Sequence, residues 1–157
     1  MTDDLDSIAP LSPRTLNPVK LVAVFSENRK GQLSRCTELL KTAGVNIHWL
    51  DISGMDSFGV IRFLVDKADL AFRTLRESGL TVSLLEVLAV EVDDQPGSLH
   101  EVVEALAREG LSLTNCSGFV FNHRAIVLLE LPEMAGGRQV VQGMGLHELT
   151  QEEMLGL

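Results

Sequence analysis

An internal repeat is the feature that most limits how this chain can fold. The stretch "ENRKGQLSRCTELLKTAG" ends at Gly44, and a matching stretch, "DDQPGSLHEVVEALAREG", ends 66 residues later at Gly110. Each stretch has a polar loop, a Gly-x-Leu step, an amphipathic helical pattern and a closing glycine. Self-similarity at a fixed spacing predicts that one supersecondary unit is built twice.

The residues that match between the copies are those that define turns and helix faces. At this spacing the identical pairs are Ala23/Ala89, Val24/Val90, Gly31/Gly97, Leu33/Leu99, Glu38/Glu104, Leu40/Leu106, Gly44/Gly110, Gly79/Gly145 and Leu80/Leu146. Glycine permits the left-handed backbone of a tight turn, and leucine fills the apolar face of a helix. Identity at these positions therefore indicates a shared fold.

Each copy can be assigned the order strand, helix, strand, strand, helix, strand. The expected strands are residues 20–25, 45–53, 58–65 and 79–85 in the first copy, and 87–92, 111–119 and 125–131 in the second. Apolar residues at helical spacing follow each glycine loop, and Gly44 and Gly110 then end the helices. This order predicts an α+β protein made of two ferredoxin-like βαββαβ units.

The later helices have less uniform signals. Asp66 can cap the second helix of the first copy. Three glycines within residues 134–143 predict that the corresponding helix of the second copy is short or irregular. Thr150 and Glu153 have the spacing of a capping box, which predicts a final helical turn.

The two copies follow each other without a linker. We expect a flexible leader over residues 1–18, a first domain over 19–85 and a second over 86–157. Because no flexible segment separates the domains, we expect them to pack as a pseudo-symmetric pair.

Composition limits the function classes. A net charge of −9 opposes binding to nucleic acid or to an anionic membrane. The apolar runs are too short to span a membrane, and the N-terminus lacks the pattern of a secretion signal, so we expect a cytoplasmic protein. The two cysteines and four histidines have no metal-ligand spacing, and we expect neither a metal nor a cofactor.

The repeated motifs resemble those of the ACT domain, a regulatory module that binds amino acids. The resemblance rests on "SENRKGQLS" with "AGVNIHWL" and on "DDQPGSLHE" with "EGLSLTN", and it covers Val19 to Leu157. The chain is similar to stand-alone proteins that contain two ACT domains and nothing else. This chain departs from the family pattern at two positions. It has Lys30 where the family has proline, and Ser112 where the family has asparagine.

The glycine corners are the candidate ligand sites. A tight turn into a helix exposes the unpaired amides of the first helical turn, and such amides attract a carboxylate. Polar side chains beside the corners can contact an amino group, and the resemblance implies that the start of another domain's second strand completes the site. The candidate residues are Asn28, Lys30, Gly31, Gln32, Leu33, Asn46, Ile47, Asp94, Pro96, Gly97, Ser98, Leu99, Ser112 and Leu113.

Several residues near these corners have simpler interpretations. Ser98 and Glu101 have the spacing of a helix cap. Cys36 lies on the core face of a helix and is expected to be buried. Trp49 is expected at a domain or subunit contact. Arg62 lies in an apolar strand and is expected to face the less covered side of the sheet or to pair with a carboxylate.

Three functions remain open on this basis. The first is a non-catalytic regulatory protein that binds a free amino acid where ACT domains meet, as a homodimer and in contact with an enzyme of amino-acid metabolism. The second is an oligomerisation or partner-enzyme interaction module whose ligand sites are vestigial. The third is an acyl-phosphate hydrolase using Arg29 and Asn28, but a single glycine in that loop is a poor phosphate cradle.

Overall fold

The computed structural model describes residues 17–27 and 29–157. The elements in that part are β1 (Val19–Glu27), α1 (Gln32–Thr42), β2 (Ile47–Met55), β3 (Phe58–Val65), α2 (Ala68–Glu77), β4 (Thr81–Val92), α3 (Ser98–Arg108), β5 (Asn115–Phe121), β6 (Arg124–Glu130), α4 (Met134–Gly143), β7 (His147–Leu149) and α5 (Gln151–Leu155). Most of the expected leader, and Asn28 of the candidate site, lie outside the described residues.

The repeat is visible in the element boundaries. Helices α1 and α3 begin at Gln32 and Ser98, and helices α2 and α4 begin at Ala68 and Met134. Both pairs are separated by the 66 residues found in the sequence. The predicted α+β fold with two βαββαβ units is therefore confirmed.

A single long strand joins the two units. The antiparallel strand order is β2-β3-β1-β4-β6-β5, and β7 also pairs with β4. Residues Thr81–Val87 of β4 pair with β1, whereas Leu88–Val92 pair with β6. Strand β4 is thus the last strand of the first unit and the first strand of the second. The proposed division at residues 85 and 86 falls inside this strand.

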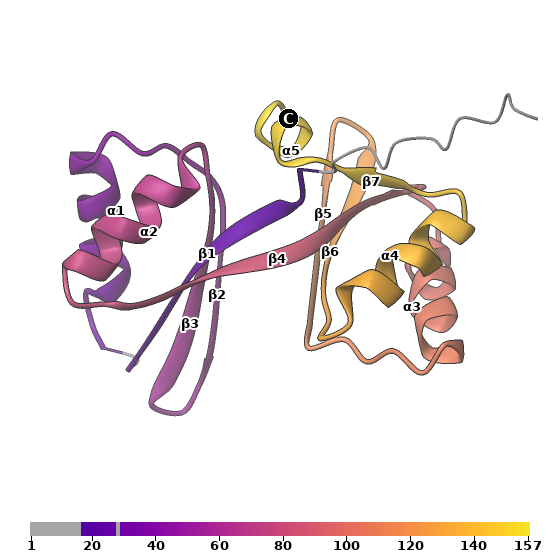
Figure 1. The fold of residues 1–157 in the computed structure, drawn as a ribbon, viewed down its shortest axis with the longest axis horizontal. Coiled ribbons are helices and arrows are strands. Elements are labelled where there is room, and N and C mark those ends of the chain that lie inside the picture. Colours follow the sequence, from indigo (N-terminus) through magenta and orange to yellow (C-terminus); the bar gives the residue numbers. More distant parts are fainter. Residues whose placement is uncertain (1–16, 28) are drawn as a thin grey trace, which may run out of the picture.

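The strands of the first unit and the strands of the second unit form two sheets that share β4. These sheets face each other, with the helices on the outside (Figure 1). Helices α1 and α2 cover a core that includes Phe63 and Leu75, and helices α3 and α4 cover a core that includes Leu88 and Leu129. A third core lies between the sheets and contains the buried side chains of Val19, Leu21, Leu64, Val87, Ala89, Ile126, Leu128, Leu149 and Met154. We call this third cluster the inter-unit core.

The predicted glycine stops at the helix C-termini are present, whereas two of the predicted side-chain caps at helix N-termini are not. Gly44 and Gly110 have φ of 70° and 71°, as a left-handed helix stop requires. The predicted caps at Asp66 and at Ser98 with Glu101 are wrong, because neither α2 nor α3 has a side-chain hydrogen bond at its N-cap.

The C-terminal helix α5 has the predicted capping box. The Glu153 amide donates to the Thr150 hydroxyl at 3.2 Å, and the Thr150 amide donates to the Glu153 carboxylate at 2.8 Å. The backbone amide of Gln151 also donates to the Asn17 carbonyl at 3.0 Å, which fixes α5 beside the start of β1.

The expectation of a short or irregular α4 is wrong. This helix has 10 residues, as many as α2. A Cβ atom at Gly137 would lie 2.6 Å from a methyl carbon of Leu131 and 3.1 Å from one of Leu88, so glycine allows the helix to approach the core closely. Packing against the sheet thus compensates for the low helix propensity of glycine.

No helix in residues 17–27 and 29–157 is both long enough and apolar enough to cross a membrane.

Candidate functional site

Two glycine corners start helices α1 and α3. Gly31 and Gly97 are the N-cap residues, with φ of 81° and 94°, and no side-chain hydrogen bond caps either helix among the described residues. The first helical hydrogen bonds run from Arg35 to the Gly31 carbonyl and from Glu101 to the Gly97 carbonyl. The Gln32 and Ser98 amides donate to the Arg29 and Gln95 carbonyls, and in the described part of the chain no side chain caps the amides that follow them, as an anion site requires.

The loop residues expected at the sites are mostly accessible. At the first corner Lys30 and Gly31 are exposed and Gln32 and Leu33 are half-buried. The exposed residues of the second corner are Asp94, Pro96, Gly97 and Leu99, and Ser98 is half-buried. Both corners can thus be reached from solvent.

The second-strand candidates of the first unit lie beside α2. The exposed residue Asn46 precedes β2, its backbone amide donates to the Asp66 carboxylate at 2.9 Å, and its carbonyl accepts from the Asp66 amide at 3.2 Å. Asp66 therefore fixes the start of β2 instead of capping α2. Ile47 packs against the core beneath α1 and α2.

The second-strand candidates of the second unit precede β5, which begins at Asn115. Ser112 is exposed, and Leu113 packs against the core beneath α3 and α4. The sequence placed both residues inside a strand, but the structure places them in the loop that leads into it.

The two units do not meet at the glycine corners. The inter-unit core contains none of the candidate residues, and the helices that begin at the corners lie on opposite outer sides of the molecule (Figure 1). Sequence reasoning missed this arrangement. The available signal was β1, "VKLVAVF", which is apolar on both faces, a pattern typical of a sheet covered on both sides.

A hollow of about 230 Å³ lies at the first corner. It is lined by Gln32, by the ends of β1 and β4, and by two arginines. Arg29 pairs with Glu27, and the Arg35 guanidinium donates to the Ser78 carbonyl at 2.7 Å. The hollow therefore combines a helix start with two guanidinium groups, one of which is paired with the Glu27 carboxylate that also lines the hollow.

The two corners have opposite charge. At the first corner Arg29, Lys30 and Arg35 are cationic. The residues 66 positions later, which occupy the same places in the second unit, are Gln95, Pro96 and Glu101. The second corner also carries Asp93 and Asp94 in its loop, where the first has Glu27 and Asn28, so the only acid of this set at the first corner is the partner of Arg29. An anionic group is therefore favoured at the first corner and disfavoured at the second.

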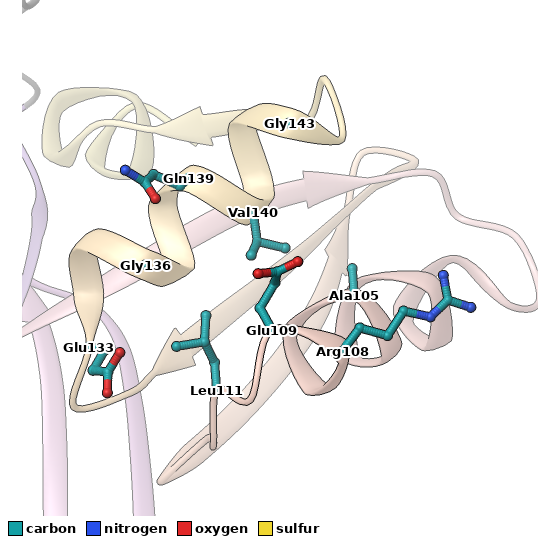
Figure 2. A pocket seen from close by; sticks show the side chains of 9 residues that line it. All are labelled: Ala105, Arg108, Glu109, Leu111, Glu133, Gly136, Gln139, Val140 and Gly143. Carbon is teal, nitrogen blue, oxygen red and sulfur yellow. The ribbon is translucent and has the colours of Figure 1, made fainter.

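A larger hollow, of about 540 Å³, lies between α3 and α4 (Figure 2). Its lining includes Ala105, Glu109 and Gly136, at positions where the first unit has Leu39, Ala43 and Leu70. The first unit fills this space with those partly buried side chains. The hollow borders the C-terminal half of α3 and contains none of the candidate residues.

Two features bear on the chemistry of the described residues. No group of three or more His, Cys, Asp or Glu side chains in that part of the chain could hold a metal ion. Burial raises the pKa of the Cys36 thiol and that of the Cys116 thiol, which lowers the thiolate fraction of both.

Comparison with known proteins agrees with this architecture. A sequence model of the ACT domain pair matches residues 17–156, and the chain therefore belongs to the ACT domain pair family. No curated protein matches the sequence significantly.

Solved structures share the fold. Protein BT0572 from Bacteroides thetaiotaomicron is 25% identical and superposes with a TM-score of 0.82, over 90% of this chain and 99% of that one. The regulatory subunit of aspartate kinase from Thermus flavus is 15% identical with a TM-score of 0.57, over 82% of this chain and 92% of that one. The second likeness concerns the fold alone.

Proposed function

We propose that this protein is a non-catalytic regulator that binds a free amino acid at the first glycine corner. The observation that carries the proposal is the combination, at one corner, of a left-handed Gly31, a helix start that no described side chain caps, and a hollow lined by Arg29 and Arg35. The amides and guanidinium groups suit the α-carboxylate of an amino acid.

A second copy of the chain would complete the site. Within one chain the units meet through their sheet faces, which leaves both corners without a facing domain. Strands β2 and β5 are edges of the sheet, and apolar side chains lie exposed on β2 at Leu50 and Ile52 and in the second unit at Leu99 and Val120. These edges favour a homodimer in which the β2 or β5 edge of one copy lies beside a corner of the other.

The second corner is proposed to bind weakly or not at all. Its glycine is also left-handed, but Asp93 and Asp94 lie in the loop before the helix and Glu101 lies in its first turn. Repulsion by these carboxylates opposes the carboxylate of a ligand. We therefore expect one occupied site per chain.

The regulated partner is proposed to be a cytoplasmic enzyme of amino-acid metabolism. ACT domain pairs share their fold with the regulatory subunit of aspartate kinase from Thermus flavus, which supports a regulatory role without identifying the partner. The alternative is an interaction module with vestigial sites, which the exposed apolar strand edges would also suit.

A thermal-shift screen against the twenty amino acids tests the proposal. A ligand at about 100 times its dissociation constant stabilises the fold by about 2.7 kcal/mol. That gain raises the melting temperature by about 5–10 °C for a chain of this size. The shift should occur with one or a few amino acids. If none acts at millimolar concentration, the interaction-module alternative replaces the binding proposal.

Two variants at equivalent positions identify the occupied corner. Arg35→Gln should reduce the ligand-induced shift, whereas Glu101→Gln, its counterpart at the second corner, should leave it unchanged or increase it. Equal losses in both variants would contradict the assignment to the first corner.

A further inference from the structure

A charged cluster lies at the contact between the two units. Arg62 of β3 is only 9% exposed. Its Nε atom lies 3.0 Å from Oε1 of Glu130, on β6 of the other unit, in an ion pair whose angles are not those of a hydrogen bond. Its Nη1 atom donates to Ser53 Oγ at 3.1 Å and lies 3.4 Å from Oδ2 of Asp51, both on β2. One guanidinium therefore contacts the edge strand of the first unit and a strand of the second.

The cluster continues to the other edge strand through Glu130. Its Oε1 atom accepts from the Asn115 side chain at 3.3 Å, and its carbonyl accepts from the Thr114 amide at 2.8 Å and from the Thr114 hydroxyl at 3.1 Å. Asn115 is the first residue of β5, and Thr114 immediately precedes it. A continuous polar path thus runs from β2 through Arg62 and Glu130 to β5.

The repeat shows that adhesion between the units does not require this charge pair. The residues equivalent to Arg62 and Glu130 are Leu128 and Leu64, and both leucines are buried in the inter-unit core. At these equivalent positions the contact between the units therefore has two buried leucines in one case and an ion pair in the other. A buried ion pair often contributes no more stability than apolar residues of similar size. The pair Arg62–Glu130 is therefore expected to have a role other than added stability.

We propose that Arg62 and Glu130 are positioning residues that tie the edge strand β2 of the first unit to the edge strand β5 of the second. The tie couples the local stability of one edge to that of the other. The inference depends on the packing of the two sheets and not on the nature of any ligand, so it stands or falls independently of the proposed amino-acid site.

Hydrogen exchange in the full-length protein tests the tie. In the double variant Arg62→Leu/Glu130→Leu, which copies the leucine pair, the urea midpoint should be unchanged or higher. Amides of β2 and β5 that bond to β3 and β6 should nevertheless exchange at least about tenfold faster, because the edges lose their common partner. Amides of α1 and α3 should be unaffected.

The control is Leu64→Ala, on the same strand and within the inter-unit core. It should lower the urea midpoint and accelerate exchange in both units without preference for β2 and β5. Wild-type exchange in β2 and β5 of the double variant would overturn the proposal. A lower midpoint with uniformly faster exchange would also overturn it, because the cluster would then only add stability.

A conservative variant covers the case in which the double variant does not fold. Glu130→Gln keeps the side-chain volume and an oxygen acceptor for Asn115, but it removes the charge that faces Arg62. Exchange in β2 should then increase although the substitution lies in the second unit. Unchanged exchange in β2 would overturn the proposal.

Discussion

Two glycines of α4 should respond in opposite ways to the same substitution. In Gly137→Ala, the new methyl group would lie 2.6 Å from Leu131 Cδ1 and 3.1 Å from Leu88 Cδ1, both in buried side chains. Overpacking of this kind costs about 1–3 kcal/mol, and the better helix propensity of alanine returns about 1 kcal/mol. We expect a net loss of about 1 kcal/mol.

In Gly143→Ala, the methyl group meets no atom within 4 Å. Only the propensity gain remains, and it is small in the last turn, so we expect stabilisation by about 0.5 kcal/mol. The two variants should therefore differ by about 1.5 kcal/mol, which is about 3–6 °C in Tm. Urea unfolding followed by far-UV circular dichroism and by Trp49 fluorescence measures the difference. The packing argument fails if Gly137→Ala is as stable as Gly143→Ala.

Two further predictions concern α5. Thr150→Ala should lower the free energy of unfolding by about 1 kcal/mol, measured by urea unfolding, because it removes the N-cap hydroxyl; an unchanged midpoint would show that α5 needs no cap. The hydrogen bond from the Thr150 amide holds the pKa of Glu153 below its ordinary value. A lowered folded-state pKa stabilises the fold above the unfolded value of about 4.3 and loses that effect as the pH falls, so the stability difference between wild type and Glu153→Gln should shrink from pH 7 to pH 3.

Much of the fold could be predicted because the same pattern of strands, helices and turn glycines occurs twice in the sequence. The strand over residues 58–65 matches β3, and the glycines that end the helices have the expected positive φ. The length of α4 could not be predicted from helix propensity alone. Its glycines are tolerated because the helix packs closely on Leu88 and Leu131, and that contact depends on residues distant in the sequence.

The candidate site could be predicted only in part. Local turn chemistry fixed the two corners, and the predicted loop residues are accessible. The sequence could not predict that the two units meet away from the glycine corners, because their contact depends on which sheet faces pack together. Arg62 illustrates the limit: the sequence left open the less covered side of the sheet or a carboxylate partner, and the partner's position on the second unit, at Glu130, depends on the face-to-face packing of the sheets.

The fold itself explains why both glycine corners are present, so the glycines alone do not identify a binding site. Each unit would expose the apolar face of its sheet without the other, and the shared strand β4 binds the pair further. Both corners must therefore keep the turn that starts a helix, and both glycines have the positive φ that this turn requires. The charge around the turns is less constrained by the fold, although Arg35 also donates to the Ser78 carbonyl at the end of α2. Its divergence, from Arg35 in the first unit to Glu101 in the second, is for this reason the stronger indication that only the first corner receives an anionic group.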